Sequence, residues 1–318
     1  MRQPCSLPLV ALSTVVVLLL AACGESSDES ADTTLAPTTT EQATTTTTAS
    51  TTTAATTTTD PDTEDVVVVE SPGEGDPWDI LFFGFDDVFT RLAGQLYADQ
   101  LAQELDVEMR LYEPPGFDHV WAATLVEQLR GDRYPPLGDY VPPAEVIVLL
   151  SRPGESPGGE DEYIVEDFER CWWRPFEGVP PTSDLTDDYW AVYRRLLDEV
   201  YAELWSLRQD QPTLLITLDL YNPSLQQQRQ SGIDKGCIAW FESWRDQIAR
   251  AAEAHSSVFV SLQDVFNGLD HQLDPTAAAL IGPSEADPTA PWYRSTPSGA
   301  SQIADALVAA SLEALNTR

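Results

Sequence analysis

The feature that most constrains the fold of this chain is a regular alternation of short apolar runs with longer amphipathic segments between residues 80 and 315. The apolar runs predict strands over residues 80–83, 107–112, 145–150, 213–218 and 257–261. Apolar residues at helical spacing predict helices over residues 90–105, 120–129, 189–207, 238–254 and 298–315. Strands that alternate with such helices form βαβ units, whose right-handed crossovers cover both faces of a parallel sheet. We therefore predict an α/β fold with three α/β/α layers and a parallel five-stranded sheet.

The charge balance excludes one class of partner. The 318 residues include 52 Asp and Glu against 17 Lys and Arg, which gives a formal net charge of −35. Nucleic acids and anionic lipid surfaces are themselves polyanions, and binding them requires clustered basic residues. We therefore expect no nucleic-acid partner and no direct attraction of the chain to anionic headgroups.

The first residues resemble a bacterial lipoprotein signal. A positive start at Arg2 precedes an apolar stretch over residues 9–20, which is shorter than the roughly 20 residues that a membrane-spanning helix needs. The run Leu20-Ala21-Ala22-Cys23 is similar to a lipobox. The resemblance implies cleavage before Cys23, a lipid on its thiol, and an extracytoplasmic position in which this lipid is the one contact with the bacterial cell membrane. The alternative is an ordinary signal peptide with an incidental cysteine.

The segment after Cys23 is rich in Thr and poor in side chains that could be buried. Such a segment cannot offset the conformational entropy lost on ordering, so we predict a disordered, stalk-like linker, with its glycosylation left open. The predicted organisation is a signal peptide over residues 1–22, the lipidated cysteine and linker over residues 23–70, and one folded domain over residues 71–318.

Two cysteines remain for the folded domain. Cys5 leaves with the signal peptide and Cys23 is the lipid site, which leaves Cys171 and Cys237 in an oxidising compartment. We favour a disulfide between them, and two buried thiols are the alternative. The sequence has three histidines and lacks a Cys-x-x-Cys motif, so we expect no metal site and no cofactor.

Four short motifs follow one another along the domain. They are Tyr97-Ala98, the run Asp219-Leu220-Tyr221-Asn222-Pro223, the run Asp264-Val265-Phe266-Asn267-Gly268, and Pro297-Ser298-Gly299. Their order resembles that of the SGNH/GDSL hydrolase family, which implies an SGNH hydrolase-like domain over residues 71–318. The resemblance implies a flavodoxin-like SGNH hydrolase fold. In such sheets ligands bind at the carboxyl ends of the strands.

The residues that perform catalysis in that family are substituted here. The position of the nucleophilic serine falls on Asp86, and the oxyanion-hole asparagine position lies in a stretch that contains Arg152. The positions of the orienting acid and the base fall on Tyr293 and Thr296. A serine nucleophile needs a hydrogen-bonded base and fixed oxyanion donors, so the resemblance implies the fold without the activity. We therefore assign no catalytic residue with this pattern.

Other residues near the predicted strand ends define a candidate cleft. Its predicted lining is Gly84, Gly116, Asp219 and Asn222. Asp87 and His271 are possible replacements for the missing acid and base, and an exposed loop histidine is the alternative for His271. Acidic residues at these ends could also hold a divalent cation, or form a solvated surface.

Two functions follow from this sequence. The first is a cell-surface lipoprotein whose impaired hydrolase-like domain binds a ligand, such as a cell-envelope glycan, an acyl ester or another small molecule. The second is an active esterase or acetyl-ester hydrolase with a rebuilt site.

Overall fold

A computed structural model of the chain describes residues 76–83, 87–112, 114, 121–134, 136–154, 162–209, 211–283 and 293–316. The predicted signal peptide, Cys23 and the linker lie outside these residues. In the described part of the chain, no helix is both long and apolar enough to span a membrane.

The centre of the domain is a parallel five-stranded sheet, as the alternating pattern predicts. Its strands are β1 (Trp78–Phe83), β2 (Met109–Tyr112), β3 (Val146–Leu150), β4 (Leu214–Leu218) and β5 (Val258–Val260). Their order in the sheet is β2-β1-β3-β4-β5, and every neighbouring pair is parallel. This is the flavodoxin-like order, so the predicted fold class is confirmed.

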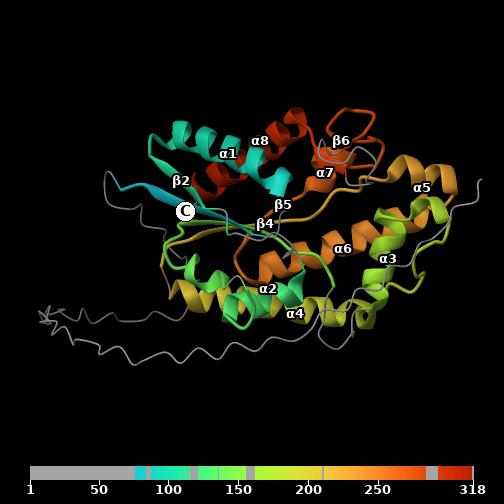
Figure 1. Cartoon of the computed structure of the whole chain (residues 1–318), viewed down its shortest axis with the longest axis horizontal. Coiled ribbons are helices and arrows are strands. Elements are labelled where there is room, and N and C mark those ends of the chain that lie inside the picture. Colours follow the sequence, from blue (N-terminus) through green and yellow to red (C-terminus); the bar gives the residue numbers. More distant parts are fainter. Residues whose placement is uncertain are drawn as a thin grey trace, which may run out of the picture. The chain divides into compact units, whose positions relative to one another are not determined.

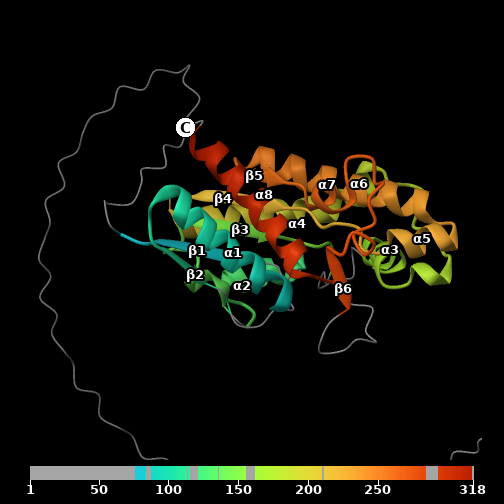
Figure 2. The same cartoon turned by 90° about the horizontal axis from the view of Figure 1, so that it is seen from above.

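Helices cover both faces of the sheet (Figure 1). One face carries α1 (Asp87–Leu105) and α8 (Pro297–Asn316), which lie side by side in both views (Figures 1 and 2). The opposite face carries α2 (Ala122–Arg130), α4 (Asp187–Arg208) and α6 (Asp234–Ala254). These five helices are the five that the apolar periodicity predicts.

Several short elements were not predicted from the sequence. They are α3 (Glu162–Trp172), α5 (Leu225–Ser231), α7 (Leu262–Asn267), the antiparallel pair β6 (Ile281–Pro283) and β7 (Tyr293–Ser295), and two 3₁₀ turns, η1 (Leu137–Asp139) and η2 (Pro175–Glu177). Except for η1, these elements follow the carboxyl ends of strands or precede α8. They therefore build the surroundings of the sheet edge where the candidate site lies.

Burial in the core explains why the central strands consist mainly of apolar residues. Every residue of β1, β3 and β4 is buried, because helices cover both faces of the sheet. The helices α1 and α8 are also joined by a buried hydrogen bond of 2.8 Å between the Tyr97 hydroxyl and Ser311 Oγ. The Tyr97-Ala98 motif therefore contributes to packing between these two helices.

Candidate functional site

The carboxyl ends of the five parallel strands meet at one edge of the sheet, where open α/β proteins bind ligands. Among the described residues, Ser151 and Arg152 follow β3, Asp219 follows β4, and Ser261 follows β5. The predicted residues Gly84, Asp86 and Gly116, like Cys23, lie outside the described residues. Asp87 begins α1 and Tyr293 begins β7, so the fold places both positions next to this edge.

Arg152 is the positively charged residue at the end of β3, where the resembled family has its asparagine. Its backbone forms an isolated parallel bridge with Trp121 and accepts a hydrogen bond of 2.9 Å from the Ala122 amide. Its guanidinium carbon lies 5.8 Å from the ring centroid of Phe168 and 5.5 Å from that of Trp172. Guanidinium groups at this distance from aromatic faces are attracted by the ring quadrupole. The half-buried Arg152 side chain is thus held between α3 and the sheet edge.

Phe168 lies at the centre of an aromatic cluster that supports this arginine. Phe168 and its neighbours Trp172, Trp240 and Trp244 are buried. The rings around Phe168 have centroids between 5.3 and 6.3 Å from its own, and they belong to Trp121, Trp172, Trp173, Trp240 and Trp244. Neither Phe168 nor Trp121 was identified from the sequence. Phe168 lies on α3, a helix that the sequence pattern did not predict.

Asp219 is buried, and its carboxylate is used inside the fold. It accepts hydrogen bonds from Ser261 Oγ at 2.9 Å and from the amides of Leu262 and Gln263, at the start of α7. Burial raises the pKa of Asp219 to about 7, an effect that these three hydrogen bonds partly oppose. The residue therefore joins the end of β4 to α7.

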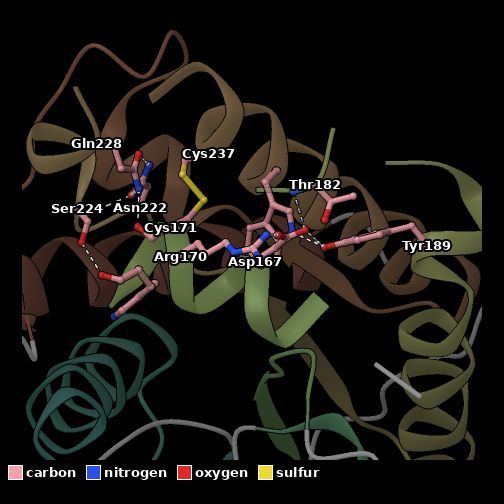
Figure 3. Close-up of a disulfide and its surroundings, with 11 residues drawn as sticks. Asp167, Arg170, Cys171, Thr182, Tyr189, Asn222, Ser224, Gln228 and Cys237 are labelled. Atoms are coloured by element: carbon pink, nitrogen blue, oxygen red, sulfur yellow. Dashed lines mark hydrogen bonds and ion pairs between the residues drawn. A yellow bond between two sulfur atoms is a disulfide. The ribbon is translucent and has the colours of Figure 1, made fainter. Parts of the chain in front are cut away.

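Asn222 is also held by neighbouring side chains. Its amide exchanges two hydrogen bonds with the Gln228 amide, at 2.8 and 2.9 Å, and the Gln228 amide nitrogen also donates to the Cys171 carbonyl (Figure 3). The Asn267 side chain exchanges two further bonds with the Asn222 backbone, at 2.8 and 2.9 Å. The loop after β4 is therefore tied to the carboxyl ends of α3 and α7, which accounts for both Asn-containing motifs in structural terms.

The disulfide between Cys171 and Cys237 is present, as predicted, and it joins α3 to α6 (Figure 3). Both cysteines are fully buried. Next to it, the buried carboxylate of Asp167 accepts hydrogen bonds from the Thr182 amide at 2.9 Å and from the Tyr189 hydroxyl at 2.8 Å. No pattern in the sequence distinguishes Asp167 from the many exposed acids.

Thr296, at the position where the resembled family has a histidine, is held at the entrance of α8. Its hydroxyl donates to the Ala279 carbonyl at 2.6 Å and accepts from the Gly299 amide at 3.2 Å. Its own amide donates to the Leu280 carbonyl at 2.9 Å. A Cβ atom on Gly299 would lie 2.1 Å from that same carbonyl oxygen, so the helix start is packed closely against Leu280. Thr296 therefore acts as the N-terminal cap of α8.

Substitution of this cap tests its role. We expect Thr296→Ala to lower the free energy of unfolding by about 1 kcal/mol, because the Gly299 amide loses its acceptor. Thr296→Ser keeps a hydroxyl and should retain most of the stability. Urea unfolding of the two variants and the parent chain measures this difference. Equal stability of the alanine variant and the parent would show that the cap contributes nothing.

His271 is buried, so the interpretation of an exposed loop histidine is wrong. Its Nε2 atom lies 3.3 Å from Glu242 Oε1 on α6, and its carbonyl accepts a hydrogen bond of 2.8 Å from Arg229 on α5. No hydrogen bond or ion pair in the described part of the chain joins His271 to Asp219 or Thr296. The loop after α7 turns the imidazole against α6.

The described residues include no group of three or more His, Cys, Asp or Glu side chains that could hold a metal ion. Among the acidic residues that follow the predicted strands, Asp86 and Glu113 lie outside the described residues. Asp219 already accepts three hydrogen bonds. The described part of the edge is thus defined by Arg152 and its aromatic neighbours.

Comparison with known proteins gives structural likeness alone. No protein-family model and no curated protein matches the chain. Similar solved structures include TesA, with 13% identity over 74% of this chain and 99% of TesA, at a TM-score of 0.40. Phospholipase A1 from Streptomyces albidoflavus NA297 has 10% identity over 75% of this chain and 99% of its own, at a TM-score of 0.43.

A third similar structure is a variant of Axe2, an acetyl-xylooligosaccharide esterase from Geobacillus Stearmophilus. It has 15% identity over 76% of this chain and 94% of its own, at a TM-score of 0.35. Likeness at these identities and TM-scores carries neither an activity nor a substrate over to this chain.

Proposed function

We propose that this chain is a bacterial surface lipoprotein whose domain has the SGNH hydrolase fold and binds a ligand without hydrolysing it. The observation that carries the proposal is how the hydroxyl of Thr296 is hydrogen-bonded. A general base must reach the proton that it removes, whereas this position supplies a hydroxyl that caps α8 through Ala279 and Gly299. The family's base is therefore replaced by a structural residue.

The orientation of His271 supports the same proposal. An imidazole that replaced the family's base would need to face the strand ends near the start of α8. The ring instead lies against Glu242 on α6, in a buried setting. The histidine therefore contributes to packing of the loop after α7.

The ligand contact is proposed at the end of β3. The guanidinium of Arg152 is planar and can donate hydrogen bonds to an acceptor, and the bridge to Trp121 fixes the backbone of this residue at the sheet edge. Carbonyl, hydroxyl and acid oxygens are suitable acceptors for these donors, which fits a cell-envelope glycan or an acyl ester. The lipid on Cys23 and the Thr-rich linker would hold the domain outside the cell at the membrane.

Activity and binding assays on the whole chain test this function. We expect no turnover of p-nitrophenyl acetate or of O-acetylated xylo-oligosaccharides above the rate in buffer. The informative variants are Asp86→Ala, His271→Ala and the triple restoration of Asp86→Ser, Tyr293→Asp and Thr296→His. Turnover by the parent that is lost in Asp86→Ala or His271→Ala would establish an active esterase with a rebuilt site and overturn the proposal.

Binding is measured with the same O-acetylated oligosaccharides and with glycan fragments of the bacterial cell wall. We expect Arg152→Ala to weaken binding about tenfold, the loss of one charge-assisted contact. Arg174→Ala is the matched control. Arg174 follows the carboxyl end of α3, and its side chain forms an ion pair of 2.8 Å with Glu169. Equal binding by the parent and both variants would exclude the end of β3 as the ligand site.

A further inference from the structure

The strand β2 has an open edge. It lies at the end of the sheet order β2-β1-β3-β4-β5, and among the described residues β1 is its sole neighbour in the sheet. A strand at the edge of a sheet presents a row of backbone groups that another strand can pair with.

The register identifies which backbone groups of β2 face outward. The Trp78 amide donates to the Glu108 carbonyl at 2.8 Å, and Trp78 is aligned with Met109. Backbone groups of successive residues point to opposite sides of a strand, so those of Arg110 point toward β1 like those of Glu108. The N–H and C=O groups of Met109 and Leu111 therefore point away from the sheet.

The side chains along this edge are also suited to a neighbouring strand. Met109 and Leu111 are half-buried and pack against the core, whereas Tyr112 is exposed over 36% of its surface. An added strand with apolar β-branched side chains would extend the covered surface beyond Met109 and Leu111.

The sequence provides such a strand shortly before β1. Residues 66–69 are four consecutive valines, bounded by Asp65 and Glu70, at the end of a linker that otherwise has few apolar residues. Valine is enriched in strands because its branched side chain packs well on a pleated surface. This run equals β2 in length, since β2 also has four residues.

The connection from this run to β1 is long enough. A strand beyond β2 lies two strand spacings from β1, or about 10 Å. The eight residues 70–77 lead from the valines to Trp78, and eight extended residues span up to about 26 Å. A chain that reverses direction over these residues would place Val69 near Met109, at the amino end of β2.

We propose that residues 66–69 pair with the open edge of β2 as a sixth, antiparallel strand. The pairing satisfies the outward backbone groups of Met109 and Leu111 and closes the edge against other chains. The folded unit then begins with this strand, and a pull transmitted through the linker acts first on the edge of the sheet.

Amide hydrogen exchange in the whole chain tests the pairing at single residues. We expect the amides of Met109 and Leu111 to exchange slowly, and to exchange about tenfold faster or more in Val67→Pro or Val68→Pro. Adjacent residues of a strand face opposite sides, so one of the two prolines removes a pairing N–H group. The Arg110 amide points toward β1, so its exchange rate should be the same in all variants and reports that the sheet is intact.

Thr57→Pro is the matched control, because it introduces proline within the Thr run of residues 56–59 of the same linker. Exchange at Met109 and Leu111 should be unchanged in this variant. Rapid exchange at both amides in the parent, or rates that neither valine substitution alters, would overturn the proposal. Protection that increases with protein concentration and survives both substitutions would also overturn it, since a second copy would then cover the edge.

Discussion

Replacement of Asp219 by asparagine is expected to remove a pH dependence of stability worth about 4 kcal/mol. Burial raises the pKa of Asp219 to about 7 in the folded chain, against 3.8 for an unperturbed aspartate. Between these values the folded chain keeps a proton that the unfolded chain has released. The free energy of unfolding therefore falls as the pH rises, and the contribution is fully present below about pH 4 and lost above about pH 7.

The asparagine variant is a close structural match for the protonated acid. Its amide oxygen can accept from the Leu262 and Gln263 amides, while its NH₂ group donates to Ser261 Oγ. We expect nearly equal stability of the two proteins below about pH 4, where Asp219 is protonated in both the folded and the unfolded parent, and a more stable variant near pH 8, measured by urea unfolding at each pH. Taking the difference between the two proteins removes the repulsion among the other carboxylates of this acidic chain. A parent that is more stable than the variant at pH 8 would show that the ionised carboxylate, as a cap of α7, stabilises the fold.

Removal of the disulfide is expected to cost a similar amount. The bond closes a loop with a sequence separation of 66 residues, and the loss of that constraint in the unfolded chain corresponds to about 4 kcal/mol. The double substitution of Cys171 and Cys237 by alanine should lower the free energy of unfolding by this amount. It should also increase hydrogen exchange at the carboxyl end of α3, where the Cys171 carbonyl accepts from Gln228.

The two single variants separate the cross-link from the packing of the sulfur atoms. Either Cys171→Ala or Cys237→Ala alone removes the bond, so we expect both singles and the double variant to agree within about 0.5 kcal/mol. The expectation would be contradicted if the double variant lost as much free energy of unfolding as the two single variants together. That result would mean that packing around each side chain, and not the covalent link, carries the stability.

The five strands and five long helices could be predicted because their patterns are long and regular. Residues 146–150 are apolar without interruption, since the strand is covered on both faces. The helix α5 could not be predicted, because its sequence Leu-Gln-Gln-Gln-Arg-Gln-Ser has one apolar residue. It is stabilised by tertiary hydrogen bonds, such as those of Gln228 to Asn222, that no local pattern indicates.

The position of the candidate site could be predicted from the sequence, but the residues that surround it could not. Arg152 and Thr296 stand at positions where the resembled family has other residues, and the parallel sheet places the residues after its strands at one edge. The aromatic neighbours of Arg152 are Phe168 and Trp172 on α3. The packing of α3 depends on the disulfide and on the aromatic cluster. Likewise, the burial of His271 depends on how the loop after α7 returns to α6, which is a property of the tertiary structure.

The cap at Thr296 creates a requirement for a hydroxyl at the entrance of α8. A histidine at this position, as in the resembled family, would remove the hydroxyl that the Gly299 amide uses, at a cost of about 1 kcal/mol. An imidazole introduced here alone would therefore weaken the start of α8 and would bring no catalytic gain without a nucleophile beside it. Selection for stability would disfavour this single change, so the helix start opposes the gain of a base at this position.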